Sequence, residues 1–361
     1  MSKTFAALGI GAGYRCFIIA ELSANHNHDM GRALEIVRAA AAAGADAIKL
    51  QTYTPDTLTI ASVRDEFRVT GTIWATETLH SLFQKAYMPW EWHKPLFDEA
   101  ARLGIKFLST PFDFSAVDFL ESLGVDLYKV ASSELVDIPL IKRIAQTGKP
   151  VLIATAMGTL DEIEEAIATL RDNGCSEICL LKCTASYPAK IEDANMATLI
   201  DMRRRFGTLV GLSDHTMPVT VPVVAAALGA KVIEKHLTLR RADGGPDAEF
   251  SLEPDEFAEM VHAVRAAESA QGEIIYAPAA SEIRPRDFRR SLYVVRDMAQ
   301  GEDFTPENLR SIRPAAGLHT RHYEALLGTR ARCAIAAGTP LTAAMVEIET
   351  TSPCGEGECY D

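Results

Sequence analysis

The 361-residue sequence has no uninterrupted apolar run near the ~18 residues that a transmembrane helix needs. Its first apolar stretch is broken by Gly9, Gly11 and Gly13, so we expect neither a membrane-spanning helix nor a signal peptide. Positive charge is also scarce, because 36 Lys and Arg residues against 49 Asp and Glu residues leave a net charge of −13. That balance disfavours nucleic acid and anionic membrane surfaces as partners.

Several catalytic motifs are absent as well. No G-x-G-x-x-G motif opens the first expected helix, and the sequence has no P-loop, no Cys-x-x-Cys pair and no Ser-His-Asp order. Dinucleotide binding, nucleotide hydrolysis, thiol redox chemistry and acyl transfer therefore have little support. The seven cysteines are odd in number and mostly scattered, which is typical of reduced thiols and predicts a cytoplasmic protein. Cys354 and Cys359 are interpreted as part of a C-terminal tail without a special role.

Short apolar runs alternate with Ala- and Leu-rich amphipathic stretches from residue 17 onward, as in βα units on a parallel sheet. Eight such units in roughly 250 residues favour a (β/α)8 TIM barrel over a doubly wound open sheet. The expected helices include Gly31–Ala43, Asp161–Asp172 and Pro218–Leu228, with glycines near several helix ends. The expected strands are Phe17–Leu22, Ala45–Thr52, Ile105–Thr110, Leu127–Ala131, Pro150–Thr155, Ile178–Thr184, Thr208–Ser213 and Lys231–Leu237.

The rest of the chain departs from this alternation. The segment Tyr53–Thr76 is longer than an ordinary βα loop, and long loops at this end of a barrel build lids and pockets. We expect the barrel at residues 1–272, a linker at 273–287, a small domain at 288–350 and a tail at 351–361. The small domain repeats the pattern of Ala299–Thr305 at Ala336–Thr342, 37 residues later. We expect a β-rich unit in which each copy contains a strand, a Gly turn and a short helix.

The C-terminal ends of the expected strands are unusually polar. In a barrel these ends face the active site, and a solvated rim does not readily explain polar side chains at seven of them. Because strand residues alternate in direction, three pairs of polar residues share a face and can form an inward-facing cluster: Lys49 with Gln51, Ser213 with His215, and Glu234 with His236. By contrast, the aromatic residues Trp74, Trp90 and Trp92 with His93 are interpreted as helix packing rather than as a sugar platform.

His215 and His236 end consecutive expected strands. Neighbouring strands lie about 4.8 Å apart, so both imidazoles can reach one ion at about 2.1 Å. Two histidines with oxygen ligands from water and substrate suit Mn²⁺, Mg²⁺, Fe²⁺ or Zn²⁺. The pair therefore predicts a divalent metal site.

Four lysines concentrate positive charge at the same rim, and such a reversal of sign in an acidic protein indicates a site for a small, multiply charged anion. A phosphorylated carboxylate has this character. These lysines are Lys49, Lys129, Lys182 and Lys235. Hydroxyl groups of Thr110, Ser132 and Ser213 could complete a phosphate cradle. Glu21, Glu134 and Glu234 are candidates for acid–base chemistry.

These strand-end motifs resemble those of the sialic-acid-synthase family. The resemblance runs from about residue 15 to residue 348, and several motifs in order are far more specific than any one alone. The region from about Arg286 onward, including Ser311–Pro314, resembles the family's antifreeze-like (SAF) domain. The barrel motifs are Ala20–Asn27, Ile48–Asp56, Tyr128–Ser132, Lys182–Pro188, Gly211–His215 and Ile233–His236.

The resemblance implies a metal-dependent condensation of phosphoenolpyruvate (PEP) with an open-chain amino-sugar aldehyde, with release of phosphate. It implies Mn²⁺, with Mg²⁺ or Co²⁺ as alternatives, held by His215 and His236. It also implies a domain-exchanged homodimer in which Arg313 of the partner subunit reaches the sugar. By the same resemblance, PEP would contact Lys49, Thr110, Lys129, Ser132 and Ser213. The sugar would face Glu134, Tyr187 and Asp247.

The Ser-Ala-Asn-His-Asn sequence after the first strand favours the pseudaminate branch of this family, whose sugar is 2,4-diacetamido-2,4,6-trideoxy-altrose. Ala154 and Ala185 stand where some relatives place a phosphate-contacting Ser and Asn. That contact would then move to Thr155, Thr184 or Ser186. Three alternatives stay open: N-acetylmannosamine or a legionaminate precursor as the sugar, a metal-dependent pyruvate aldolase, and a non-enzymatic carbohydrate- or ice-binding protein.

Overall fold

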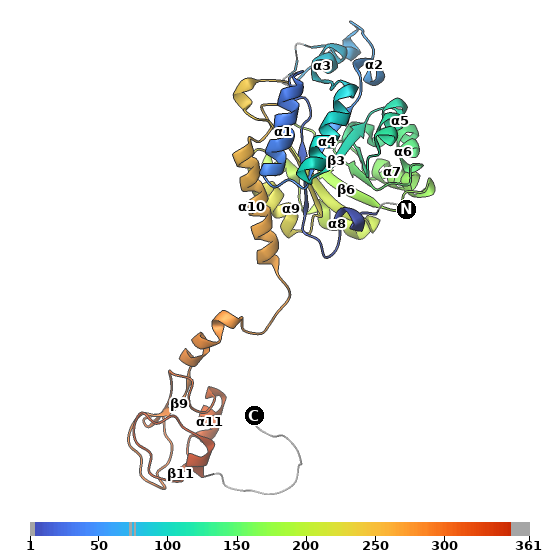
Figure 1. Ribbon diagram of the computed structural model, residues 1–361. Helices are drawn as coiled ribbons and strands as arrows, with labels where there is room; N and C mark the ends of the chain where they lie inside the picture. The colour runs from blue at the N-terminus through green and yellow to red at the C-terminus, as the bar shows by residue number, and fades with distance from the viewer. Residues whose placement is uncertain (1–3, 72–73, 76, 348–361) are drawn as a thin grey trace. The chain divides into compact units, whose positions relative to one another are not determined.

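The computed structural model describes residues 4–71, 74–75 and 77–347. Eight parallel strands close into a barrel in chain order, which confirms the expected (β/α)8 architecture (Figure 1). The strands are β1 (Phe17–Glu21), β2 (Ala47–Thr52), β3 (Lys106–Pro111), β4 (Tyr128–Val130), β5 (Val151–Ala154), β6 (Ile178–Cys183), β7 (Leu209–Asp214) and β8 (Val232–His236). The register sets Glu21 beside Lys49 of β2 and beside His236 of β8, so three polar residues share one level of the barrel.

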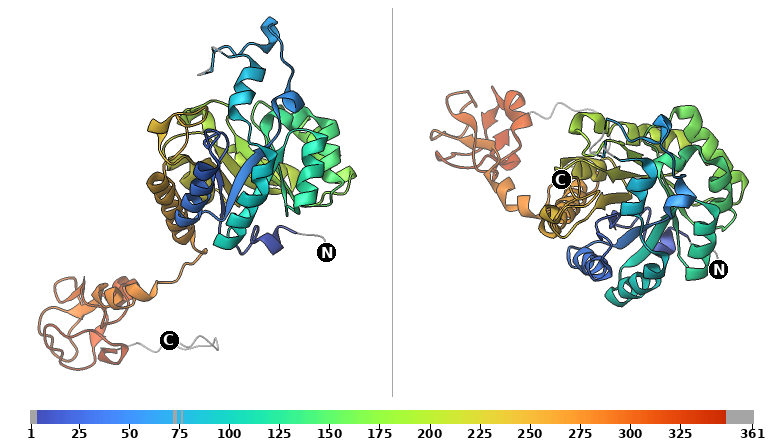
Figure 2. Two further views of the ribbon diagram at one scale, coloured as in Figure 1. Left: turned by 45° about the horizontal axis from the view of Figure 1, so that its top comes forward. Right: turned by 90° about the horizontal axis from the view of Figure 1, so that it is seen from above.

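The strands are surrounded by an outer layer of helices, which Figure 2 shows from above. These helices are α1 (Met30–Ala42), α4 (His93–Leu103), α5 (Phe114–Leu123), α6 (Ile138–Ala145), α7 (Leu160–Asp172), α8 (Thr198–Phe206), α9 (Thr220–Ala227) and α10 (Pro254–Gln271). Local signals set their ends: Asp113 accepts from two N–H groups at the start of α5, and Gly124 ends it with a φ of 80°. No helix in the described part of the chain is long and apolar enough to cross a membrane.

The segment between β2 and β3 is folded rather than an open loop. It contains α2 (Pro55–Leu58), α3 (Leu79–Ala86) and a 3-10 turn at Trp90–Trp92. Thr54 and Thr78 cap α2 and α3, and each makes a reciprocal bond with the residue three positions on. Trp90 packs its ring 4.9 Å from Phe119 of α5, as the packing interpretation of this residue predicts.

The barrel interior has two layers of different chemistry, because alternate residues of each strand point inward. The lower layer, at the N-terminal ends, is an apolar cluster sealed from below by Phe5, Leu8 and Ile10. We define this lower layer as Phe17, Ile19, Ala47, Leu108, Leu127, Leu152, Cys179, Leu181 and Val232. The upper layer continues the same inward-facing positions with Glu21, Lys49, Thr110, Lys129, Ser213, Glu234 and His236. Residues of the opposite parity, such as Ile18 and Ile48, pack against the helices.

Contacts divide the chain after Gly272, and the C-terminal unit has its own core. It contains 3-10 turns at Ala280–Glu282 and Arg284–Phe288, the antiparallel pair β9 (Ser291–Val294) and β10 (Leu309–Ile312), α11 (Tyr323–Leu326), and the short pair β11 (Arg330–Ala331) and β12 (Val346–Glu347). Leu292, Phe304, Leu309 and Leu341 are fully buried in this core.

The expectation of a short helix in each copy of the internal repeat is confirmed in the second copy, where Ala343–Met345 form a 3-10 helix, and is wrong in the first. After Thr305 the chain makes only a turn, because the Asn308 side chain accepts from the Thr305 N–H and donates to the Asp303 carbonyl. The Thr305 carbonyl accepts from the Asn308 and Leu309 N–H groups, so a single helical turn forms there before β10 begins at Leu309.

Candidate active site

A cavity of about 270 Å³ lies at the C-terminal ends of the barrel strands. Its floor is part of the upper layer, and its sides come from the loops after the strands and from α3. The side chains that line it include Ser23, Lys49, Gln51, Tyr53, Trp74, Phe83, Lys129, Ser132, Cys183, Tyr187, Ser213, His215, Glu234, His236, Asp247 and Phe250. Most of the residues expected at the site thus meet in one place.

Two lysines and two glutamates form a buried charge cluster, in which Lys49, Lys129 and Glu234 line the cavity floor and Glu21 lies just behind it. The Lys49 ammonium lies 2.6 Å from Glu21 and 3.6 Å from Glu234, and the Lys129 ammonium lies 3.7 Å from Glu234. Ser213 donates a hydrogen bond of 3.1 Å to Glu234. The cations and carboxylates balance, so the large positive surplus expected from four lysines is not present.

The environment separates the pKa values of the two glutamates. Burial, together with the nearby Glu234 charge, raises the pKa of Glu21 above its usual value. Burial acts on Glu234 in the same direction, but the ammonium groups of Lys129 and Lys49 outweigh it and lower the pKa of that carboxyl. Burial also lowers the pKa of Lys129. Two carboxyls with pKa values pushed in opposite directions are suited to different roles in proton transfer.

The rings of His215 and His236 lie 5.3 Å apart, centroid to centroid, beside the charge cluster. The Nδ1 of His215 lies 2.9 Å from the Thr184 carbonyl, so this nitrogen is the donor and Nε2 keeps its lone pair. The Nδ1 of His236 is buried and has no hydrogen-bond partner in the described part of the chain. Burial lowers the pKa of His236 well below its usual value, so its ring is neutral. Burial acts to lower the pKa of His215 as well, but the neighbouring Cys183 sulfur outweighs it and raises the pKa of that ring. His236 can therefore bind a divalent metal ion as it stands, and His215 can bind through Nε2 once its ring is neutral.

The protein itself would supply only those two ligands. Among the described residues, no group of three or more His, Cys, Asp or Glu side chains lies in a metal-binding arrangement. The remaining ligands of an ion would have to come from water or substrate, which is the open coordination typical of a catalytic metal.

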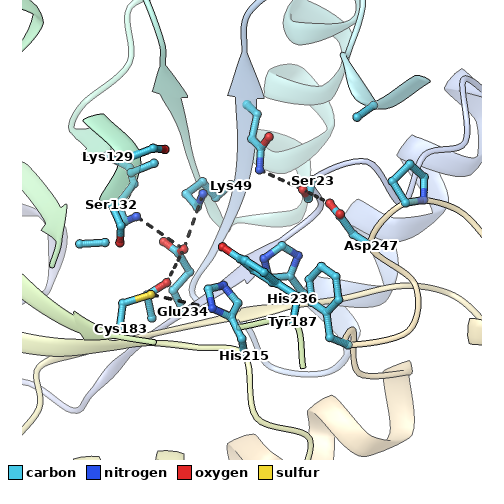
Figure 3. A pocket seen from close by; sticks show the side chains of 18 of the residues that line it. Ser23, Lys49, Lys129, Ser132, Cys183, Tyr187, His215, Glu234, His236 and Asp247 are labelled. Carbon is cyan, nitrogen blue, oxygen red and sulfur yellow. Dashed lines mark hydrogen bonds and ion pairs between the residues drawn. The ribbon is translucent and has the colours of Figure 1, made fainter. Parts of the chain in front are cut away.

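A second polar group lies on the other side of the histidines, as Figure 3 shows. Ser23 donates a short hydrogen bond to the Asp247 carboxylate, and Gln51 donates to both Ser23 and Glu21. Burial raises the pKa of Asp247. The cavity therefore has a lysine side with Lys49, Lys129 and Ser132, a carboxylate side with Ser23 and Asp247, and the two imidazoles between them.

Comparison with known proteins identifies the protein family of this chain. Residues 36–276 match the NeuB family, and residues 289–347 match the SAF domain. The chain is 42% identical over 332 residues to a pseudaminic acid synthase of Helicobacter pylori, and the match covers 91% of this chain and 97% of that protein. The chain belongs to the NeuB family.

Two further proteins are similar to this chain at lower identity. The N,N′-diacetyllegionaminic acid synthase of Legionella pneumophila is 36% identical over 336 residues, covering 92% of this chain and 94% of that protein. A crystal structure of N-acetylneuraminic acid synthetase from Leptospira borgpetersenii, in complex with citrate, matches with a TM-score of 0.69 and 30% identity over 76% of this chain and 92% of its own. The resemblance noted in the sequence is confirmed, and the chain is a condensing enzyme of this family.

Three expected site residues lie just behind the lining of this NeuB-family cavity. Glu21 and Thr110 contact it through Lys49, whose ammonium lies 3.3 Å from the Thr110 hydroxyl. Glu134 is buried and accepts a hydrogen bond from Ser133, which does line the cavity. Arg313 lies in the C-terminal unit, where it is exposed.

Two of the four lysines do not face the cavity. Lys182 and Lys235 occupy the outward parity of β6 and β8, next to the inward-facing Cys183 and His236. The Lys182 ammonium donates to the Cys183 carbonyl, and the Lys235 ammonium forms a buried ion pair of 2.7 Å with Asp214. The expected contribution of Lys182 to substrate binding therefore has no support in this geometry.

The hydroxyl groups expected to make the phosphate contact in place of Ala154 and Ala185 also lie outside the cavity lining. Each of them donates to a backbone carbonyl instead: Thr155 to Leu181, Thr184 to Asp193, and Ser186 to Pro188. Ser132, by contrast, lines the cavity and accepts from the Ala156 N–H.

Several lining residues were not expected from the sequence. Trp74 lines the cavity rather than packing between helices, although its place in the long segment after β2 was a signal for a pocket loop. Gln51, by contrast, lines the cavity on the inward face of β2 that it shares with Lys49, as strand alternation predicts. Phe250, in the irregular segment after β8, carried no such signal.

Proposed function

We propose that this chain condenses PEP with 2,4-diacetamido-2,4,6-trideoxy-altrose to give pseudaminic acid and phosphate, in a reaction that depends on a divalent metal ion. The observation that carries the proposal is the single cavity in which Lys49 and Lys129 face the pair His215 and His236. The 42% identity to a pseudaminic acid synthase over 91% of this chain supports the choice of reaction.

PEP would lie on the lysine side of the cavity. The ammonium groups of Lys49 and Lys129 would bind its carboxylate and phosphate, and the Ser132 hydroxyl would donate a further hydrogen bond. The Ser213 hydroxyl would donate to PEP in place of its bond to Glu234. The same ammonium groups stabilise the phosphate as it leaves with cleavage of its C–O bond. Since Glu21 and Glu234 already balance the two lysines, a trianionic donor needs a further positive charge nearby.

A metal ion held by His215 and His236 would supply that charge, and when bound it acts as a Lewis acid toward the sugar aldehyde. The two side chains fit this role because the bond to Thr184 leaves Nε2 of His215 available and because the His236 ring is neutral. Their position between the lysine side and the carboxylate side would hold the aldehyde next to the PEP carbon that attacks it.

Glu234 is the residue we assign to the water that adds at C2 of the PEP unit. Its carboxyl lies within 3.7 Å of both ammonium groups, and its lowered pKa keeps it ionised and able to accept the water's proton. Its Oε2 is buried and has no hydrogen-bond partner in the described part of the chain. Glu134, the other candidate base, accepts a hydrogen bond from Ser133 and does not line the cavity.

The decisive experiment is mass spectrometry of the products, with a coupled assay of phosphate release, from PEP and each candidate sugar in the presence of Mn²⁺, Mg²⁺ or Co²⁺. We expect the fastest metal-dependent phosphate release with the 2,4-diacetamido sugar. Faster turnover of N-acetylmannosamine or of the legionaminate precursor would contradict the substrate. A product formed without phosphate release would indicate an aldolase, and no turnover with any sugar would favour a binding protein.

We also propose that the active protein is a domain-exchanged homodimer in which Arg313 of the partner subunit completes the site. Arg313 is exposed in the C-terminal unit, which leaves its guanidinium accessible to a second chain. Mixing an Arg313→Ala chain with a His215→Ala chain should restore part of the activity, because one of the two sites in a mixed dimer is then intact. Verified mixed dimers without activity would refute a shared site.

A further inference from the structure

Three aromatic side chains form one face of the cavity, and we call this set the aromatic wall: Trp74, Tyr187 and Phe250. The Trp74 ring lies 5.8 Å from that of Tyr187 and 6.3 Å from that of Phe250, and the last two lie 4.9 Å apart. These three residues come from three different connections of the barrel, after β2, β6 and β8. Tertiary packing therefore builds the wall as a unit.

The wall extends away from the two histidines in a fixed order. Tyr187 lies 4.4 Å from the His215 ring, and Phe250 lies 5.0 Å from the His236 ring. Trp74 contacts Tyr187 and Phe250, and these two residues separate it from the histidines. An aldehyde bound at the histidines would direct the distal carbons of its chain along the wall toward Trp74.

A hydrogen bond fixes Trp74 in this position. Its indole N–H donates to the Pro246 carbonyl at 2.9 Å, so the indole edge is tied to the segment after β8. The next residue is Asp247, which accepts from Ser23 on the carboxylate side of the cavity. The polar edge of the indole is thereby satisfied by the protein, and its ring faces offer apolar contact.

From this arrangement we infer that Trp74 is a specificity-determining residue, whose indole selects amino sugars that carry apolar groups, an acyl methyl or a 6-deoxy carbon, at the end distant from the aldehyde. The inference rests on the proposed function, because it takes the histidines as the place of the aldehyde. A sugar hydroxyl next to the Trp74 indole loses its water against ring faces that offer it no hydrogen bond, because the one polar atom of the indole already donates to Pro246. Apolar pockets discriminate against an added hydroxyl by up to about 100-fold.

The test compares kcat/KM for 2,4-diacetamido-2,4,6-trideoxy-altrose with kcat/KM for N-acetylmannosamine in the wild type, Trp74→Phe and Trp74→Ala. We expect Trp74→Ala to raise KM for the deoxy sugar roughly 10- to 100-fold and to reduce the preference for it by a similar factor. KM for PEP should stay within about twofold, since PEP lies on the other side of the histidines. Trp74→Phe, which keeps a ring, should retain more of the preference than Trp74→Ala.

Trp90→Ala is the matched control. Its indole also donates to a backbone carbonyl, that of Tyr53 at 3.2 Å, but its ring packs on Phe119 and does not line the cavity. We expect this variant to unfold at a lower temperature with an unchanged sugar preference. An unchanged preference in Trp74→Ala, or an equal rise in KM for PEP, would overturn the inference. If the wild type turns over neither sugar, the proposed function fails instead.

Discussion

The two layers of the barrel interior are equally buried but opposite in chemistry. In the lower layer Ile19 and Leu152 are 0% exposed, and in the upper layer Glu21 is 0% and Lys129 is 2% exposed. Buried ions cost several kcal/mol each in desolvation, which pairing offsets only in part, whereas buried aliphatic side chains stabilise the fold. One set of strands therefore stabilises the barrel at one end and bears that cost at the other, where the chemistry is expected.

The largest expected effect tests the upper layer. His215→Ala or His236→Ala should lower kcat/KM by at least roughly 10³-fold, because each variant leaves a metal ion with a single protein ligand. The midpoint of thermal unfolding should change by only a few degrees. Chelator treatment of the wild type should have the same effect on phosphate release, and added Mn²⁺ should restore it.

The control for this prediction is His262→Ala, which removes an exposed imidazole from α10 and should leave turnover unchanged. Near-wild-type turnover of His215→Ala in chelator-treated buffer would contradict the metal role and would leave the polarity of the upper layer unexplained.

Variants of an inward-facing and an outward-facing lysine test whether the side of the barrel wall that a lysine faces decides its role. Lys129→Met removes one of the two ammonium groups in the cavity and should lower kcat/KM for PEP roughly 10²- to 10³-fold. Lys182→Met makes the same change on the outer face and should leave kcat/KM within about threefold of wild type. Equal losses in steady-state kinetics would show that the side a lysine faces does not decide its role.

The lower layer should respond in stability and not in catalysis. Leu152→Ala leaves a cavity in the apolar cluster and should reduce the free energy of unfolding by about 2–5 kcal/mol, as measured by urea denaturation. The kcat/KM of the folded fraction should stay within about threefold. A loss of catalysis larger than the loss of stability would mean that the two layers are coupled.

The smallest expected effect concerns a buried polar group outside both layers. Burial lowers the pKa of His93 to about 4, and its Nε2 lies 2.8 Å from the Thr52 hydroxyl. The unfolded chain takes up this proton near pH 6.5 and the folded chain only near pH 4, so stability falls as the pH drops through that window. The loss is about 3 kcal/mol at most.

Urea denaturation at pH 7 and pH 4 measures this effect, and His93→Gln provides the comparison. The variant should lose less stability than the wild type between the two pH values, because it has no imidazole to protonate. Identical losses of stability in the wild type and the variant would show that His93 does not contribute to the pH dependence.

Much of the fold and part of the candidate site follow from local patterns. The eight strands lie where apolar runs predict them, and the polar strand ends predict the edge of the barrel that holds the cavity. His215 and His236 were predicted to be neighbours because consecutive strands of a barrel are adjacent in space. Lys235, between Glu234 and His236, faces outward for the same periodic reason, so alternation alone could have removed it from the cavity.

The sequence by itself determined the βα order, the two imidazoles at neighbouring strand ends and the family to which the chain belongs, because these depend on short-range periodicity and on motifs in order. Only the tertiary structure decided which lysines reach the cavity, that two glutamates balance them, and that Trp74 and Phe250 meet in one wall. Those features arise when barrel closure and loop packing bring together residues far apart in the chain, and no local pattern encodes such distances.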